Sequence, residues 1–234
     1  ALNVTGAFRI GNDGGSVGVM NLESGAVIVS NINTFAGDEN NIGHGGGDAT
    51  FNISGGSFDA SRNFRVGNEG GTGTVTITGG SLTIGGTDDI FIGRDRGTGV
   101  VNQSGGVVDF NHNTFIGNGN NAGSDTSGTY TLSDGVLNVR REFAIGREGA
   151  NATHTGTLTM TGGTINKTGD EKMIVGQNNG KGIVTHSGGT INVNNELLIG
   201  NENAGAEGTY TISGTAALNV GNELIVGRES GTGT

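Results

Sequence analysis

Residues 72–93 read TGTVTITGGSLTIGGTDDIFIG, and this stretch decides the fold. Apolar and polar residues alternate through positions 74–78, again through 82–84 and again through 90–92. A period of two is the pattern of a half-buried β-strand, and the intervening Gly and Asp residues are turn formers. The stretch therefore predicts three short strands separated by turns, and no helix.

The same unit recurs along the chain. Its closing pair, Ile92-Gly93, belongs to a series of apolar–Gly landmark pairs whose glycines stand at 11, 43, 67, 93, 117, 146, 176, 200 and 227, with a mean spacing of 27 residues. Such short strands are not stable alone, but equivalent strands of successive units can pair in parallel. Each coil would then rise ~4.8 Å.

We therefore predict an all-β fold in which residues 1–234 form one domain, a parallel β-solenoid. It is expected to be a right-handed, three-sided β-helix of about nine coils, the handedness following from the preference of parallel crossovers. Because the chain starts and stops in the middle of a unit, we expect it to be a segment of a longer protein with flanking domains.

Alternation also predicts the interior. The first segment of each unit places apolar residues inward in one stack: Leu2, Phe58, Leu82, Val108, Leu137, Ile165, Ile191 and Leu218. Gln103 and His186 stand at inward positions where other units have Ile, Leu or Met. We interpret both as buried polar groups that find hydrogen-bond partners in the core.

Composition excludes several classes of function. The chain has 50 Gly, 32 % apolar residues, no Pro and no Cys, so it can form neither disulfides nor thiolate metal sites. Its net charge of −10 argues against nucleic acid as a partner, because phosphates would be repelled. The apolar runs are too short to span a bilayer, so no membrane insertion is expected.

Two repeated motifs carry a family resemblance: Ser-Gly-Gly-Thr-Ile-Asn-Val-x₅-Ile-Gly at 187–200 and Gly-Thr-Tyr-Thr-Ile-Ser-Gly at 208–214. They resemble the β-strand repeats of bacterial autotransporter-type and exported surface proteins. The resemblance covers nearly the whole chain and departs mainly around residues 30–41. It implies a β-helix like those of β-helical carbohydrate-binding modules, located at the cell surface or outside the cell, and it implies no single activity.

One outward column suggests a ligand site. The residue between the two inward positions of the landmark segment is apolar from Phe91 onward, in the series Phe91, Phe115, Ala144, Ile174, Leu198 and Ile225. An exposed apolar stripe of this length marks a contact surface. The alternative interpretation is that a loop, another domain or a second subunit covers it. Read as a site, it is a sugar-stacking platform made of Arg65, Asp89, Phe91, His112, Asn113 and Phe115.

Three further outward series have simpler interpretations. The Thr-rich column that includes Thr74, Thr76 and Thr78 resembles an ice-binding face, although Thr is also a common solvent-facing strand residue. An Asn/Asp column includes Asn138, Asn166 and Asn192. Carboxylates recur after the landmark glycines (Asp13, Glu69, Asp95, Glu148, Glu202 and Glu229) and are interpreted as charged corner turns. No metal or cofactor is expected; Ca²⁺ is the ion that such acids would hold.

From these features we expect a non-catalytic module that binds a neutral plant-type polysaccharide, xylan or a β-glucan, on an outward strand face. The alternative is a structural or adhesive stalk of a bacterial surface protein. A polysaccharide lyase or glycosidase is a weaker hypothesis. Either enzyme needs specific catalytic acids, and carboxylates recur in most units, so no pair of them stands out as catalytic. Ice binding is weaker too, because Val100, Asn102 and Ile183 interrupt the Thr column.

Overall fold

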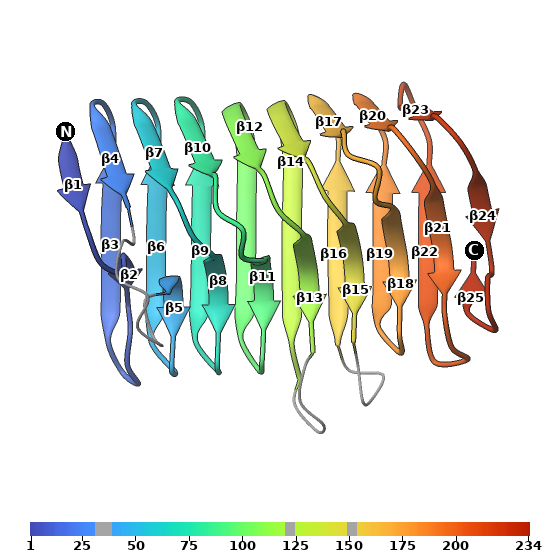
Figure 1. The fold of residues 1–234 in the computed structure, drawn as a ribbon, viewed down its shortest axis with the longest axis horizontal. Coiled ribbons are helices and arrows are strands. Elements are labelled where there is room, and N and C mark those ends of the chain that lie inside the picture. Colours follow the sequence, from blue (N-terminus) through green and yellow to red (C-terminus); the bar gives the residue numbers. More distant parts are fainter. Residues whose placement is uncertain (31–38, 120–124, 149–153) are drawn as a thin grey trace.

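The computed structural model describes residues 1–30, 39–119, 125–148 and 154–234, and these contain 25 β-strands and no helix. The predicted parallel β-solenoid is confirmed (Figure 1). Its three faces are stacks of strands, one from each coil. Within the described ranges there is accordingly no helix of the length and hydropathy needed to cross a membrane.

The first stack is called the amide face, after its outward Asn residues. It consists of β1 (Leu2–Val4), β4 (Ala26–Val29), β7 (Ser57–Ala60), β10 (Ser81–Ile84), the second halves of β12 (Thr98–Phe110) and β14 (Ser127–Val139), β17 (Thr164–Lys167), β20 (Thr190–Val193) and β23 (Ala217–Val220).

The second stack, the landmark face, contains the apolar–Gly pairs. It consists of β2 (Arg9–Ile10), β5 (Asn40–His44), β8 (Phe64–Asn68), β11 (Ile90–Arg94), β13 (Thr114–Asn118), β15 (Phe143–Arg147), β18 (Met173–Gln177), β21 (Leu197–Asn201) and β24 (Leu224–Val226).

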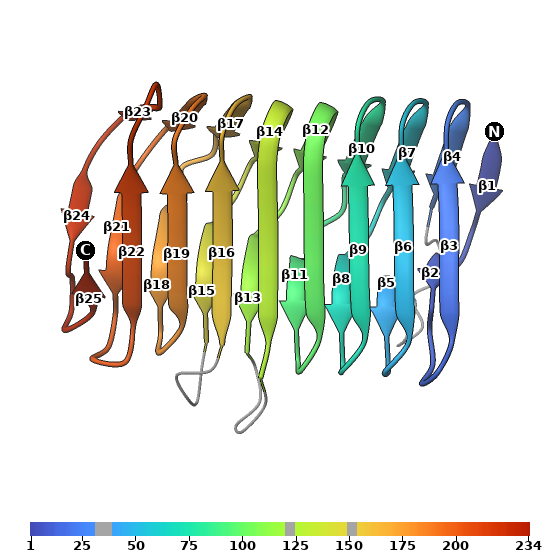
Figure 2. The same cartoon turned by 180° about the vertical axis from the view of Figure 1, so that it is seen from behind.

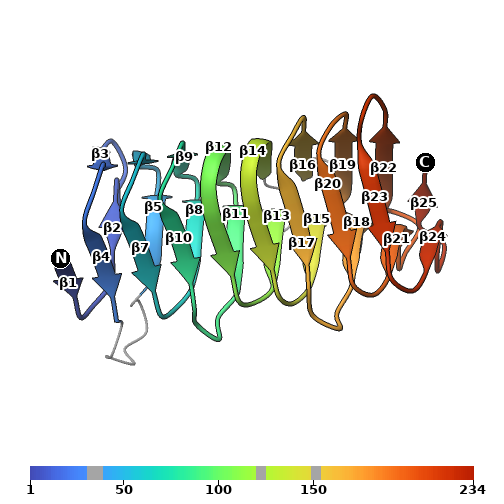
Figure 3. The ribbon, with the colours of Figure 1, turned by 90° about the horizontal axis from the view of Figure 1, so that it is seen from above.

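The third stack is the threonine face. It consists of β3 (Val17–Leu22), β6 (Asp48–Ile53), β9 (Thr72–Ile77), the first halves of β12 and β14, β16 (Thr155–Met160), β19 (Lys181–His186), β22 (Glu207–Ile212) and β25 (Thr232–Gly233). Figure 2 shows this face in front, and Figure 3 looks onto the amide face.

Neighbouring coils pair in parallel on all three faces. Nine landmark strands are separated by eight stacking steps, so the chain makes about eight turns between the first and the last of them. Equivalent residues stand opposite each other, as in Phe91↔Phe115 and Asn166↔Asn192. The repeat of the sequence thus becomes vertical columns of equivalent side chains.

The core is a single column of apolar side chains that runs inside the three faces. Phe58, Leu82 and Leu137 are buried in it, as alternation predicts. Inward residues of the terminal coils are more open: Leu2 on the amide face is 50 % exposed and Leu224 on the landmark face 53 %, because only one neighbouring coil covers each. Burial therefore depends on stacking, and a coil has no closed core of its own.

The landmark glycine lies inside the landmark strand, one residue before the corner that leads to the threonine face. Gly93 has a φ of +74°, and a Cβ there would lie 2.1 Å from the carbonyl oxygen of Ser127 in the next coil. A side chain would thus meet both an unfavourable backbone conformation and the backbone of the adjacent coil. This close approach explains why Gly recurs at this position in coil after coil.

Candidate functional site

The apolar stripe of the landmark face is not exposed, and the expectation that it faces solvent is wrong. Phe91 is 8 % and Phe115 1 % exposed, and both belong to a small cluster with Ala144, Ile174 and Leu198. The cluster is separate from the main core and lies on the outer side of β11, β13, β15, β18 and β21. The two rings therefore offer no stacking platform for a sugar.

Side chains of the same face cover the stripe. The Arg94 guanidinium carbon lies 4.5 Å from the centroid of the Phe91 ring, and that of Arg147 lies 4.3 Å from the Phe115 ring. Strand pairing explains their position, because Ile92 pairs with Ile116 and Arg94 with Asn118, while the intervening glycine is left out. The residue after the landmark glycine therefore returns to the outer side and packs over the aromatic rings.

Arg65, the arginine of the predicted platform, also has partners within the chain. It forms an ion pair with Glu39, and its guanidinium carbon lies 5.9 Å from the centroid of the Phe91 ring. Burial lowers the pKa of its guanidinium, and the negative charge of Glu39 opposes that shift. Together with Arg94, Arg65 serves to cover the stripe rather than to contact a ligand.

The three polar residues predicted to accompany the platform do come together. One carboxylate oxygen of Asp89 lies 2.9 Å from His112 Nδ1 and accepts a hydrogen bond of 2.9 Å from the Asn113 amide. His112 and Asn113 belong to the coil that follows Asp89. Of this group, His112 borders an open hollow at the corner between the amide and landmark faces.

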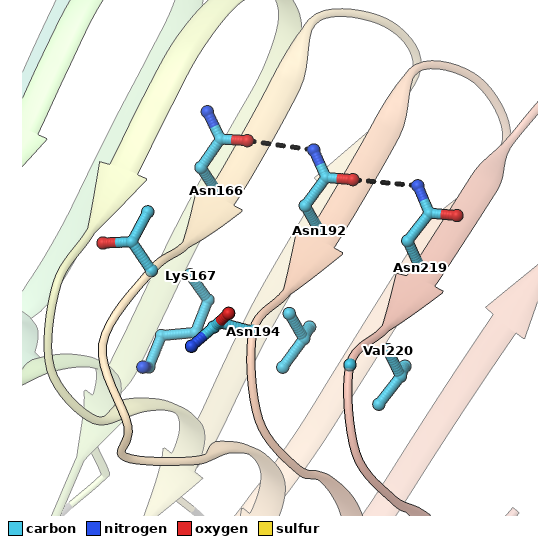
Figure 4. A pocket seen from close by; sticks show the side chains of 9 residues that line it. Asn166, Lys167, Asn192, Asn194, Asn219 and Val220 are labelled. Carbon is cyan, nitrogen blue, oxygen red and sulfur yellow. Dashed lines mark hydrogen bonds between the residues drawn. The ribbon is translucent and has the colours of Figure 1, made fainter.

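A ladder of hydrogen-bonded amides runs along the amide face. Each side-chain amide donates to the residue one coil earlier: Asn138 to Asp109 at 2.6 Å, Asn166 to Asn138 at 2.9 Å, Asn192 to Asn166 at 2.9 Å and Asn219 to Asn192 at 2.8 Å. Figure 4 shows the last three members in a row. One bond in each direction leaves every inner Asn with an N–H and an acceptor lone pair for a ligand.

Hollows recur where the strands of the amide face end and the corner to the landmark face begins. One has a volume of about 370 Å³ and is lined by the ladder residues Asn166, Asn192 and Asn219 and by the residues that follow them in their strands and corners. A second, of about 310 Å³, occupies the same position near Asp59. A third, of about 380 Å³, lies between them at the corner that carries His112. We call this series the axial groove, since its members repeat along the coil axis.

Lys167 is a buried charge that the sequence pattern did not single out. It occupies the inward position of β17, opposite Val139 and Val193, and is 1 % exposed. Its ammonium group donates to the carbonyl oxygen of Gly169 at 3.0 Å. Burial lowers its pKa, against the raising effect of Glu171 and Asp170. The alternation of the strand does predict its direction, because inward and outward residues alternate through 164–167.

The interpretation of Gln103 and His186 as partnered core residues is confirmed. Gln103 accepts a 2.5 Å hydrogen bond from the Tyr130 hydroxyl and donates to the Val136 carbonyl at 3.0 Å. His186 Nδ1 lies 3.0 Å from the Tyr210 hydroxyl. Desolvation lowers the pKa of His186 and raises that of Tyr130. Both polar residues are thus used in packing.

The carboxylates after the landmark glycines lie in corner turns, as expected. Asp95, Glu148 and Glu229 have positive φ angles and pair with the Arg that precedes each of them, at 3.2, 3.0 and 3.3 Å. Among the residues whose placement is described, no group of three His, Asp or Glu is arranged to hold a metal ion. These acids therefore stabilise the corners through local ion pairs.

The geometry defines a class: a parallel β-solenoid with a hydrogen-bonded amide ladder and a series of hollows along one corner. Comparison with family models, with curated proteins and with solved structures finds no match for this chain.

Proposed function

We propose that this chain is a non-catalytic module that binds a neutral polysaccharide, xylan or a β-glucan, along the axial groove. The observation that carries the proposal is the amide ladder, which repeats one donor and one acceptor per coil through Asn138, Asn166 and Asn192. Sugar hydroxyls both donate and accept hydrogen bonds, and amides match them without any charge. The proposal places the ligand on the amide face because the aromatic stripe is buried.

The spacing of the ladder suits an extended ligand. Neighbouring coils lie ~4.8 Å apart, which is of the same order as the length of one sugar unit in an extended β-linked chain. A polysaccharide parallel to the coil axis would meet an equivalent amide at successive sugars. Many weak contacts of the same kind add up along such a chain, as in multivalent binding. A bacterial cell-surface or secreted location, where plant polysaccharides are met, belongs to the same proposal.

The test is replacement of one ladder amide. Asn192→Ala removes the ligand-facing groups of one rung and also releases the amides of Asn166 and Asn219 on either side. We expect affinity for xylohexaose or cellohexaose to fall about tenfold, which corresponds to the ~1.4 kcal/mol of one or two hydrogen bonds. Isothermal titration calorimetry measures this directly, and affinity electrophoresis on xylan and β-glucan gels supports it.

Asn52→Ala is the matched control. Asn52 also donates to an Asn one coil earlier, Asn21, at 2.8 Å, but on the threonine face. Its removal is expected to leave affinity unchanged, with thermal melting confirming that both variants are folded. Unchanged migration of the wild-type protein on every neutral glycan would overturn the proposal. The structural stalk would then be the better description.

A further inference from the structure

From the middle hollow of the axial groove we infer a specificity site that selects a polysaccharide carrying a uronic acid, through the carboxylate of that sugar. The inference rests on the proposed function and narrows it to a neutral backbone with occasional acidic side groups. The hollow, of about 380 Å³, is formed by corner residues of three consecutive coils, namely Gly85, Gly86, Thr87, Asn111, His112, Arg140 and Arg141.

Two adjacent arginines give this hollow a positive charge. The chain has 12 basic residues against 22 acidic ones, and Arg140-Arg141 is its one pair of adjacent basic residues. Stacking holds the pair at the groove, because the Arg140 N–H donates to the Phe110 carbonyl at 2.9 Å and the Asn111 N–H to the Ile84 carbonyl at 3.0 Å. The three corners therefore lie in register beside each other (Figure 1).

Nearby acids have partners other than Arg140. Asp88 is paired with Arg62 at 2.9 Å, and Asp89 with His112 at 2.9 Å. Glu171 lies 3.8 Å from Arg141. In the part of the chain that the structure describes, the guanidinium of Arg140 has neither an ion pair nor a side-chain hydrogen bond, and the residue is exposed. It is thus available to an anion from solvent.

The chemistry of the ligand follows from the donors. A guanidinium presents parallel N–H groups in a plane, which match the two oxygens of a carboxylate. His112, Asn111 and Thr87 line the same hollow and supply groups for sugar hydroxyls. The amide ladder continues beyond this corner from Asn138 to Asn219, so a backbone lying along it brings a substituent on a single sugar to Arg140.

The experiment compares two oligosaccharides of equal length by calorimetry: a neutral xylo-oligosaccharide, and the same chain with one glucuronic acid side group. We expect the wild-type protein to bind the acidic one about tenfold more tightly, and Arg140→Gln to reduce that preference to about twofold or less. Increasing NaCl is expected to erode the preference as well, because exposed charges are screened.

Lys181→Gln is the matched control, since it also removes one exposed positive charge, but on the threonine face. It is expected to keep the tenfold preference. Equal affinity for both oligosaccharides overturns the specificity site while leaving the proposed function intact, and so does an equal loss of preference in the two variants. If neither oligosaccharide binds, the proposed function falls for xylan, and this inference falls with it. Binding of the acidic chain alone supports the site and removes the neutral-backbone proposal.

Discussion

Gly93→Ala is expected to lower the free energy of unfolding by about 2–5 kcal/mol, the sum of the cost of a left-handed backbone and the cost of overpacking. Gly93 has a φ of +74°, and the added Cβ would lie 2.1 Å from the Ser127 carbonyl oxygen of the next coil. Relief of that clash must separate two coils, whose contact is the source of the stability of both. Urea unfolding followed by circular dichroism measures the loss.

Gly70→Ala separates the two contributions. Gly70 has a φ of +80°, and nothing lies within 4 Å of the Cβ that an Ala would add. It therefore carries the backbone penalty alone, about 1–2 kcal/mol. Equal losses in the two variants would show that the close approach of coils at the landmark glycine costs nothing, contrary to the account of the corner given above.

The fold was predictable because the determining signals are local and repeated. Alternation fixes which residues face inward, and Phe58, Leu82 and Leu137 stack as it indicates. The same logic predicted that Gln103 and His186 are interior, and hydrogen bonding to Tyr130 and Tyr210 satisfies them. Each of these statements depends only on the period of two and on stacking in register.

The candidate site was less predictable, for a geometric reason. Counting residues by twos places Phe91 outward and would place Arg94, three positions later, inward. The positive φ of Gly93 removes that glycine from the ladder, so Arg94 lies on the same side as Phe91 and covers it. The exposed-platform interpretation considered Phe91 and Phe115 alone and did not foresee that this irregularity brings arginines over their rings.

The amide ladder shows a different limit. The sequence gives the column of Asn138, Asn166 and Asn192, but a column of amides on a strand is also ordinary solvent-facing surface. Its two further properties are three-dimensional: the hydrogen bonds that orient every amide, and the hollow that runs beside it. The sequence-based prediction placed the sugar site on the landmark face because Phe91 and Phe115 lie there, and exposed aromatic rings are a common feature of sugar-binding sites.

Lys167→Met is expected to stabilise the protein at pH 7 by about 1–3 kcal/mol, because replacing a buried charge with a well-packed apolar group is often favourable. Met has a similar length and would stand between Val139 and Val193 in the core stack. The lost hydrogen bond from the ammonium to the Gly169 carbonyl opposes this gain. Gly169 is half-buried and follows Thr168, which lines the open hollow, so water can replace the donor at its carbonyl.

The stability gained by Lys167→Met should decrease as the pH rises. Burial lowers the pKa of Lys167 in the folded state below its ordinary value of 10.5. At pH values between the lowered pKa of the folded protein and the ordinary pKa of the unfolded chain, the unfolded chain binds more protons than the folded one. The stability of the wild-type protein therefore rises with pH in this range. The variant lacks this contribution. The difference in urea midpoint between the two proteins should therefore be largest at pH 7 and shrink toward pH 10.5.

Lys181→Met provides the comparison, since that lysine is 45 % exposed and pairs with Glu207 at 3.6 Å. Loss of such a surface pair is expected to change stability by about 1 kcal/mol or less. A Lys167→Met protein that is less stable than wild type at pH 7 would mean that the bond to Gly169 outweighs the desolvation of the ammonium. A gain that is the same at pH 7 and pH 10.5 would mean that Lys167 keeps its proton in the core, and that burial does not set its pKa.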